Sequence, residues 1–464
     1  MPKLTFLGAA GNVTGSRYLF EDTHTQLLVD CGLYQEREFL SRNWDPSPLE
    51  PAKIEAVLLT HAHLDHIGLL PKLVRDGFKG RVYATDATLE MAEVMLLDSA
   101  RIQEEDADAK KRRHRREGRI GPYPEEPLYT VEDAQACVPM FQPIEYAKPV
   151  AFNGIKAVFA DAGHVLGSAM IYLEFKSGRA ERTICFSGDV GRPERPLQDA
   201  PSLPRSKLDY LVLESTYGDR EHPPAEEVEG ILGEIINETV KRGGNVIIPA
   251  FALERTQELL FYLKRLLASG RVARLPVYVD SPMAIKLTEI FTRHPELWGG
   301  EIDNYRKGSP FEFGGLKLTA SAAASRAIAD DKSPAIIIAG SGMATGGRIK
   351  HHLINNISRA ESTILFVGYQ ARGTLGRVIL SGTTPVRILG REYEVKARIE
   401  QIPGLSAHAG RSELLDWASS FKRPLKQVFV THGEEDTERE FAGELARRTG
   451  WPVTVPEYGQ SFDL

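Results

Sequence analysis

The amino-acid sequence predicts an α/β protein of two domains, with the second domain inserted into the first. Its 464 residues are too many for one compact core and suit two domains of ordinary size. Up to about residue 210, short strand-like runs alternate with loops, whereas residues 215–390 alternate strand-like and helix-like segments. Histidines in strand-end loops resume only beyond that middle region, which marks it as the insert. We expect the first domain at 1–212 and 391–464, and the insert at 213–390.

The composition is that of a soluble globular enzyme. Hydrophobic residues make up 42% and charged residues 26% of the chain, a balance that excludes a disordered or fibrous protein. No apolar run approaches the ~20 residues that span a bilayer, and the N-terminus lacks the pattern of a signal peptide, so we expect no membrane association. Cys31, Cys137 and Cys185 are odd in number and widely spaced, which favours the reducing cytoplasm.

The net charge of −6 and the pI near 6.1 argue against a generally basic coat for nucleic acid. Such a coat is expected when the pI of a domain exceeds about 9. A nucleic-acid substrate would therefore need a local basic groove, or metals that bind its phosphates.

Strands are expected throughout the first domain. Runs such as AVLLT and YLVLE are almost wholly apolar, which suits strands buried on both faces. Several end on a polar residue followed by a loop, where α/β proteins usually carry their chemistry. The segments include residues 3–8, 26–30, 54–60, 155–161, 182–187 and 208–214.

The insert alternates the two kinds of segment, which predicts a second α/β unit with a parallel sheet. Helices are expected at 225–241, in ERTQELLFYLKRLLAS, near 283–293 and after the Gly-rich turn of GSGMATGGRIKHHL. Strands are expected in GGNVIIPAF, LPVYVD, SPAIIIAG and STILFVGYQ. After residue 390 we expect short strands, one helix at 411–420 and the apolar strand of QVFVTHGE.

The strand at 54–60 leads directly into His61, His63, Asp65 and His66. Three imidazoles and a carboxylate within six residues cannot all face away from one another in a tight loop. Neutral imidazole nitrogens and carboxylate oxygens suit zinc. Four such residues exceed what one catalytic metal needs while a position stays open for water, so a pair of metals is predicted. Surface histidines in a loop are the alternative, and this spacing is rare by chance.

Other candidates follow buried-looking strands in similar loops. These are His164 in DAGHVLGSA, Asp189 in CFSGDVG and His432 in VFVTHGE. Taken alone, each histidine suits a structural role and the aspartate suits a turn or helix cap. Beside HAHLDH they become candidates for the ligands that two metals still lack. Asp30, which ends QLLVD, is a candidate for orienting a ligand histidine, with a turn residue as the alternative.

HAHLDH, together with Asp30, His164 and Asp189 in that order, resembles the metallo-β-lactamase family. The resemblance implies an αββα sandwich with its metals at one sheet edge. It also implies seven ligands to two Zn²⁺ ions, with a hydroxide between the ions as the nucleophile. By this resemblance, His61, His63 and His164 bind one ion, Asp65, His66 and His432 bind the other, and Asp189 bridges them.

Three later motifs resemble motifs A, B and C of the β-CASP nucleases. Glu214 opens ESTYGDR, His408 lies in GLSAHAG and His432 lies in VTHGE. GSGMATGGRIKHHL and GYQARGTLGRVILSG are similar to stretches of that family's inserted α/β domain. The resemblance covers essentially the whole chain. It is closest to short RNA-cleaving members similar to the endonuclease subunit of the eukaryotic cleavage-and-polyadenylation factor.

Phosphodiester hydrolysis explains the residues outside the metal set. Two metals ~3.5–4 Å apart lower the pKa of bound water and clamp phosphate oxygens. A separate histidine suits protonation of the leaving oxygen or binding of the phosphate. His408 would fill that role, with Glu214 favouring its protonated form. The alternatives are a buried strand-end acid for Glu214 and a helix-entry residue for His408.

The Gly-rich turn of the insert is a candidate for binding the phosphate backbone, with tight packing as the alternative. Gly342 and Gly346 precede a helix whose N–H groups would meet a phosphate, and Ser341 and Thr345 would add hydroxyls. The spacing fits neither a dinucleotide fingerprint nor a P-loop. Further candidates for backbone contact are Arg348, Arg372 and Arg377.

Residues 103–119, acidic and then basic, allow two interpretations. One is a solvated helix whose cations lie near its C-terminus, where the helix dipole favours them. The other is a basic surface that faces RNA.

The leading hypothesis is a cytoplasmic, zinc-dependent ribonuclease that hydrolyses single-stranded RNA in processing or decay. A small-ester or thioester hydrolase of the same fold would need neither the insert nor Glu214 and His408. A single-strand DNA nuclease is the harder alternative, and His432 favours RNA by resemblance, because DNA-repair relatives usually carry Val there. A degenerate RNA-binding subunit would lack metal ligands, and none of the expected seven is missing. The motifs do not decide between endo- and exonuclease action, and a homodimer is compatible with them.

Overall fold

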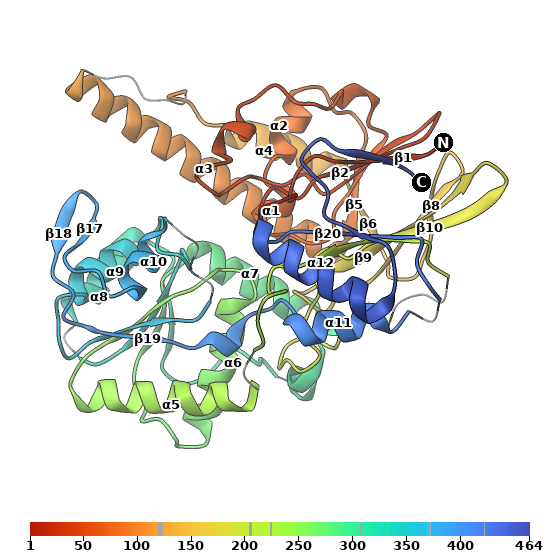
Figure 1. Ribbon diagram of the computed structural model, residues 1–464. Coiled ribbons are helices and arrows are strands. Elements are labelled where there is room, and N and C mark those ends of the chain that lie inside the picture. Colours follow the sequence, from red (N-terminus) through yellow and green to blue (C-terminus); the bar gives the residue numbers. More distant parts are fainter. Residues whose placement is uncertain are drawn as a thin grey trace. The chain divides into compact units, whose positions relative to one another are not determined.

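The computed structural model describes the chain except residues 119–123, 204–206, 223–224, 307, 332, 369, 371–372 and 422. The described residues form two compact units (Figure 1). Unit 1 contains Met1–Pro193, Ala200–Glu221 and His408–Leu464. Unit 2 contains Glu194–Asp199 and His222–Ala407.

The first sheet of unit 1 has seven strands in the order β22-β1-β2-β3-β4-β5-β6. Strands β1 to β3 form an antiparallel meander, and β3 to β6 run parallel to one another. Their bounds are β1 Lys3–Phe6, β2 Tyr18–Glu21, β3 Gln26–Val29, β4 Ala56–Leu58, β5 Arg81–Thr85, β6 Phe141–Ile144 and β22 Ser461–Asp463.

The second sheet of unit 1 has seven strands in the order β21-β20-β11-β10-β9-β8-β7. Strand β9 is antiparallel to both β8 and β10, and β11 and β20 are parallel to β10. Strands β8, β10, β11 and β20 therefore run in one direction, and their carboxyl ends lie at one edge of the sheet. The bounds are β7 Val150–Phe152, β8 Ile155–Asp161, β9 Ala169–Ser177, β10 Ala180–Phe186, β11 Tyr210–Glu214, β20 Gln427–Thr431 and β21 Val453–Thr454.

Both faces of the second sheet are buried, which explains its apolar runs. In β11, Tyr210 and Val212 join the core between the two sheets, and Leu211 and Leu213 join a second core on the other face. That second core includes residues of α11 (Arg411–Ser419) and α12 (Glu435–Thr449). Period-two alternation thus places successive side chains in different cores, as expected for a strand inside a sandwich.

Helices cover the outer faces of both sheets, so the predicted αββα sandwich is confirmed. On the first sheet, α3 Asp86–Glu117 contacts β5 and β6. Helices α1 Leu64–Ile67 and α4 Val131–Cys137 contact α3, and α2 Leu70–Arg75 contacts α4. The prediction of one helix after residue 390 was wrong, because unit 1 there contains both α11 and α12. The buried apolar residues of α12 are only Phe441, Ala442 and Leu445, a stripe too narrow to stand out in EDTEREFAGELARRT.

Residues 103–117 form the C-terminal half of α3, a single helix of 32 residues. The Thr85 side chain caps its N-terminus by accepting a hydrogen bond from the Thr88 N–H. Gly118, with φ +64°, ends it in a left-handed conformation that glycine adopts without strain. Residue 119, the last of the predicted helical segment, lies outside the described residues.

Unit 2 is a parallel α/β domain, as predicted. Its main sheet has the order β14-β13-β15-β12-β16-β19, and every neighbouring pair is parallel. Helices α9 and α10 lie on one side of this sheet and α5 on the other (Figure 1). The strands are β12 Val246–Pro249, β13 Val277–Val279, β14 Leu316–Leu318, β15 Ile336–Ala339, β16 Thr363–Phe366 and β19 Arg398–Gln401, with a separate hairpin of β17 Val386–Ile388 and β18 Arg391–Tyr393.

The helices of unit 2 are α5 Ala225–Lys241, α6 Arg255–Ala268, α7 Pro282–Arg293, α8 Ala322–Asp330, α9 Ile349–Asn356 and α10 Leu375–Leu380. Short 3-10 helices of the described chain are Leu40–Asn43, Pro51–Lys53, Val138–Met140, Pro295–Leu297, Gly300–Tyr305 and Pro403–Leu405. Among the described residues, no helix combines the length and the apolar composition needed to cross a bilayer.

Candidate metal centre

The chemistry-bearing residues of unit 1 follow strands whose carboxyl ends meet. His61 comes after β4, His164 after β8, Asp189 after β10 and His432 after β20. Each loop therefore leaves the sandwich at the same edge, although the residues are far apart in the sequence. This arrangement brings together all seven metal-ligand candidates of the sequence analysis.

The HAHLDH segment is a loop followed by one helical turn, rather than the tight loop expected. His63 precedes α1, and Asp65 and His66 lie within that helix. The turn packs closely against the loop after β3, where the Cys31 N–H donates to the His66 carbonyl at 2.7 Å, and against the loop before β2, where the Ser16 N–H donates to the Asp65 carbonyl at 2.9 Å. A Cβ on Gly32 would lie 1.7 Å from that carbonyl oxygen, so the approach requires glycine.

The first group of ligand atoms surrounds Oδ2 of Asp189. His61 Nε2 lies 3.3 Å and His164 Nε2 lies 3.4 Å from this oxygen. His63 Nδ1 lies 3.0 Å from His61 Nε2 and 3.4 Å from His164 Nε2. Three imidazole nitrogens and one carboxylate oxygen thus converge on one small volume.

The second group surrounds Oδ1, the other oxygen of the same carboxylate. His66 Nε2 lies 3.2 Å and His432 Nε2 lies 3.5 Å from Asp189 Oδ1. The two imidazole nitrogens are 3.0 Å apart, and His432 Nε2 is 3.8 Å from Asp65 Oδ2. The Asp189 carboxylate therefore divides the other six side chains into two clusters of three.

Hydrogen bonds behind the imidazoles fix their tautomers. The Thr60 hydroxyl donates to Asp30 at 2.8 Å and therefore accepts from His61 Nδ1–H at 3.1 Å. His66 Nδ1–H donates to Asp30 Oδ2 at 2.8 Å. By the same reasoning, the Thr216 hydroxyl donates to the His432 carbonyl and accepts from His432 Nδ1–H at 2.9 Å. In their neutral forms these three histidines carry no proton on Nε2.

These tautomers bear on the short distance between the Nε2 atoms of His66 and His432. In these neutral forms, two unprotonated nitrogens 3.0 Å apart repel each other unless a proton or a metal ion lies between them. Zinc ligands bound at 2.0–2.1 Å in a tetrahedral arrangement are spaced by about 3.3 Å. The spacings of 3.0–3.8 Å in both clusters match that value, and nitrogen and carboxylate donors suit zinc. The donor set therefore fits a pair of metal ions.

The surroundings shift the pKa values of the ligand candidates in both directions. Burial alone would lower the pKa of His66, but its carboxylate neighbours, Asp189 foremost, raise it well above the usual value. Burial and the neighbouring His61 lower the pKa of His63 to about 3, and burial lowers that of His164 well below its usual value. Burial by itself would raise the pKa of Asp189, but the surrounding imidazoles, His66 first among them, hold it well below the usual range. Neutral imidazoles and an ionised carboxylate are the forms that bind metals.

His408 and Glu214 form a pair beside the clusters. His408 Nδ1 lies 3.1 Å from both carboxylate oxygens of Glu214 and 3.8 Å from Asp189 Oδ2. Glu214 ends β11 with 1% exposure, and Oε1 also accepts a hydrogen bond from the Val190 N–H at 2.6 Å. Burial opposes protonation of His408, but the charge and hydrogen bond of Glu214 and the charges of Asp189 and Asp65 together outweigh it and raise the pKa to about 9.

Sequence reasoning missed the hydroxyls that orient the histidines. Thr60 directly precedes His61, Thr216 lies in ESTYGDR, and the Ser168 hydroxyl accepts from the His164 N–H at 3.1 Å. Threonine and serine are common in loops, so only their positions beside the motifs mark them. The predicted role of Asp30 gains a direct contact, since its carboxylate bonds His66 from a fully buried position.

The Gly-rich turn belongs to unit 2, between β15 and α9. The Ser341 hydroxyl accepts hydrogen bonds from the N–H groups of Thr345 and Gly346 at 3.0 and 3.2 Å, so these donors are engaged within the turn. Gly342 is buried against the exposed ring of Phe251, which a Cβ would meet at 2.6 Å. For the N–H groups of Thr345 and Gly346 and for Gly342, these contacts favour tight packing over phosphate binding.

The predicted arginine contacts have different environments. The Arg348 guanidinium is engaged within unit 2, bonding Asp280 at 2.7 Å and the carbonyls of Thr319 and Ala320. Arg377 is exposed in the short helix α10. Arg372 lies outside the described residues, so its predicted role stays a prediction.

Comparison with known proteins identifies the family. The metallo-β-lactamase superfamily model matches residues 10–149, the Beta-Casp domain model matches 256–379, and the Zn-dependent metallo-hydrolase RNA specificity domain model matches 392–456. The chain is 37% identical to ribonuclease TTHA0252 of Thermus thermophilus over 98% of its own length and 99% of that protein. This chain belongs to the β-CASP family of the metallo-β-lactamase superfamily. It is an enzyme, a metal-dependent hydrolase.

Other relatives match almost the full length of this chain. The transcription termination factor FttA of Methanocaldococcus jannaschii is 33% identical over 98% of this chain and 70% of that protein. The Cenarchaeum symbiosum FttA is 30% identical over 99% of this chain and 70% of its own length. A crystal structure of an Enterococcus faecalis protein of unknown function matches with a TM-score of 0.54 at 11% identity over both whole chains, which shows a shared fold alone.

Proposed function

We propose that this β-CASP protein is a zinc-dependent ribonuclease that hydrolyses phosphodiester bonds of single-stranded RNA with two Zn²⁺ ions. The observation that carries the proposal is the division of six ligand candidates into two groups of three by the two oxygens of Asp189, with His408 and Glu214 beside them. Relatives named ribonuclease and termination factor, and the match to an RNA specificity domain, support RNA as the substrate.

The ligands follow from the clusters. His61, His63 and His164 would hold one ion, and Asp65, His66 and His432 would hold the other, with Asp189 shared. When bound, two such ions supply a low-pKa water as nucleophile and neutralise charge on the phosphate. Three ligand histidines donate their Nδ1–H groups in hydrogen bonds to Thr60, Asp30 and Thr216. This keeps their Nε2 lone pairs available to the ions.

His408 would supply the proton that the leaving oxygen requires. Its Nδ1–H donates to Glu214, which holds the ring in place and keeps the imidazole protonated at neutral pH. The Nε2 proton would then pass to the departing ribose oxygen, or hold the phosphate in position. The backbone supports this placement, because Ala409 N–H donates to the Val190 carbonyl at 2.8 Å beside the Val190 N–H that Glu214 binds.

A cleavage assay with labelled oligonucleotides tests the proposal. RNA labelled at the 5′ end, at the 3′ end or internally is incubated with the protein, with and without chelator, beside single-stranded DNA of matched sequence. We expect RNA cleavage that chelator abolishes and Zn²⁺ restores. Cleavage that persists in chelator contradicts the metal mechanism, and preference for DNA contradicts the RNA assignment. The product lengths report endo- or exonuclease action directly.

Substitution of His408 separates the nuclease from an ester or thioester hydrolase. We expect His408→Ala to reduce RNA cleavage by about 10²–10⁴-fold, the range of a general acid, while zinc content stays unchanged. A small-ester hydrolase would keep most of its turnover in this variant. His24→Ala is the matched control, because His24 is exposed in the turn between β2 and β3.

A further inference from the structure

The C-terminal half of α3 carries a dense row of exposed cations. Four of them form what we name the α3 basic face: Lys111, Arg112, Arg115 and Arg116. At 3.6 residues per turn these four span an arc of about 140° on one side of the helix. Lys110 and Arg113, also exposed, flank it.

The opposite side of α3 is held by the chain that follows the helix. Gln103 Oε1 accepts a hydrogen bond from the Leu128 N–H at 3.0 Å, and Ser99 Oγ accepts from the Tyr129 hydroxyl at 2.8 Å. Ala107 is buried, and His114, also buried, bonds to Glu125. These contacts fix the rotation of α3, so the basic face points away from its own support.

The basic face is unfavourable for the isolated helix. Lys111 with Arg115, and Arg112 with Arg116, are like-charged pairs at i,i+4, which destabilise a helix by a few tenths of a kcal/mol each. None of the four cations has an ion-pair partner among the described residues. The helix dipole offsets part of this repulsion near the C-terminus. An external polyanion would relieve the rest.

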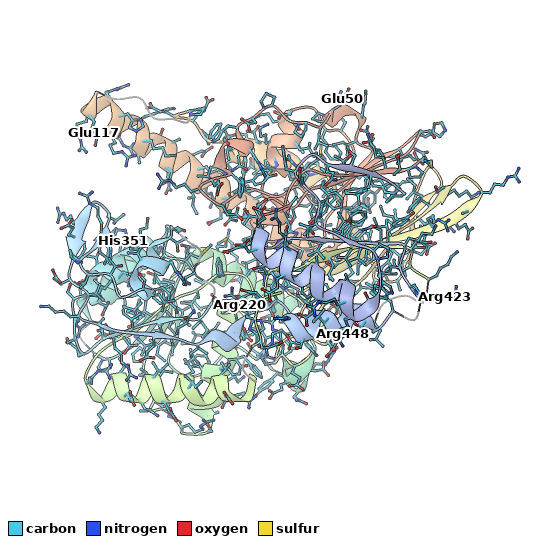
Figure 2. The ribbon with its side chains drawn as sticks, in the orientation of Figure 1. Glu50, Glu117, Arg220, His351, Arg423 and Arg448 are labelled. Atoms are coloured by element: carbon cyan, nitrogen blue, oxygen red, sulfur yellow. The ribbon has the colours of Figure 1, made fainter. Side chains whose placement is uncertain are left out.

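Charge on the whole chain sharpens the contrast. The net charge is −6, yet the stretch from Lys110 to Arg116 contains six lysines and arginines and no acid. This short stretch is thus strongly basic, although the chain as a whole is acidic. Figure 2 shows Glu117, at the end of this stretch, far out along α3 from the body of unit 1.

The chemistry of the face favours RNA over a membrane. A helix that lies on a bilayer needs large apolar side chains beside its cations. Residues 103–117 contain none, and the small Ala107 is buried. Lysine and arginine on an exposed helix bind phosphate oxygens of a nucleic-acid backbone without reading its sequence.

The other end of α3 contacts the metal centre's own loop. The hydroxyls of Thr85 and Thr88 both donate to the Gly167 carbonyl, at 2.7 and 2.9 Å, and Gly167 follows His164 in the same loop. From Thr88 to Lys111 the helix advances roughly 35 Å at 1.5 Å per residue. For a strand that keeps the stacked rise of ~3.4 Å per nucleotide, that distance corresponds to about ten nucleotides.

We propose that the α3 basic face binds the phosphate backbone of the RNA substrate about ten or more nucleotides from the bond that is cleaved. The proposal rests on the proposed ribonuclease function and adds to it a length dependence. RNAs too short to reach the face would be bound and cleaved without it.

The test replaces the four cations of the face by glutamine, a good helix former, in the full-length protein. Binding of fluorescent 30-nucleotide and 6-nucleotide single-stranded RNAs is followed by anisotropy in chelator, at 50–300 mM salt. Each neutralised phosphate contributes about −0.7 to the slope of log K against log salt for single strands. We therefore expect the slope for the 30-mer to become shallower by up to about 2.8, and its affinity at 50 mM salt to fall at least about tenfold. The 6-mer should bind and be cleaved as by the wild type.

The control removes four exposed cations from elsewhere in unit 1: Lys79, Lys156, Lys176 and Arg179. Equal weakening in this control would mean diffuse electrostatics and would overturn the proposal, as would an unchanged slope in the test variant. Loss of binding to phosphatidylserine vesicles with unchanged RNA binding would assign the face to a membrane instead. If the wild type cleaves RNA and the test variant binds the 30-mer with the same affinity and salt slope, only this inference fails. If the wild type neither binds nor cleaves RNA, the ribonuclease proposal fails as well.

Discussion

Replacing Asp30 by asparagine tests how the protein orients a metal ligand. Asp30 is fully buried and bonds three groups: the Thr60 N–H, the Thr60 hydroxyl and His66 Nδ1–H, all at 2.8 Å. Asparagine has nearly the same shape but only one acceptor oxygen. If that oxygen keeps the Thr60 N–H, the amide NH₂ faces His66 Nδ1–H, and two donors oppose each other.

The magnitude follows from this conflict. His66 relieves it by moving its proton from Nδ1 to Nε2, which removes the lone pair directed at Asp189 and the second cluster. Loss of a partner that orients a ligand histidine typically weakens metal binding by 10–100-fold. We therefore expect zinc affinity to fall by about 1.4–2.7 kcal/mol, because each factor of ten corresponds to about 1.4 kcal/mol.

Competition with a chromophoric chelator measures the zinc affinity, and circular dichroism verifies the fold. The control is Asp22→Asn, since Asp22 accepts only backbone N–H groups in a turn, from His24 and Thr25, and asparagine keeps that acceptor. A folded Asp30→Asn variant that binds zinc as tightly as the wild type would refute the reasoning. Equal weakening in the control would do the same.

Further predictions concern the acid, the packing and the core. Glu214→Gln lowers the pKa of His408, which Glu214 raises against burial, so the alkaline limb of the kcat/KM profile for RNA should move to lower pH; an unmoved limb would exclude this pair as its source. Gly32→Ala should destabilise the fold by at least about 3 kcal/mol in urea unfolding, because its Cβ would lie 1.7 Å from a carbonyl oxygen. Gly443→Ala, in open space on α12, should be neutral or stabilising. Phe159→Ala, in the core between the sheets, should cost about 3–5 kcal/mol, and a smaller loss would mean that this core repacks.

The sequence predicted the local half of the metal centre because HAHLDH is contiguous. His66 and His432 are 366 residues apart, however, and only the parallel register of β11 with β20 explains how His432 returns to the site. Its position at the end of a strand made His432 a candidate ligand, and the family resemblance assigned it to the same ion as Asp65 and His66. The physical reason is topological, since loops after parallel strands share one edge.

The hydroxyls behind the ligands were not predictable in the same way. No sequence motif marks Thr60 and Thr216. Each hydroxyl acts as an acceptor for a histidine because its hydrogen is already donated to another oxygen, and only the structure shows this. Helix α12 was missed because its apolar stripe is narrow, and α3 was predicted only over its charged half, because Asp86–Arg101 shows no comparable change of charge. The domain boundaries at 212 and 390 stay predictions.

Zinc titration of the stripped protein tests the central claim most directly. Chelator-treated protein is titrated with Zn²⁺ while bound metal and cleavage of single-stranded RNA are measured on the same samples. Two clusters divided by Asp189 predict two tightly bound equivalents per chain, with full cleavage returning only as the second is filled. Cleavage without metal, or saturation of binding and activity at one equivalent, would contradict the two-metal ribonuclease.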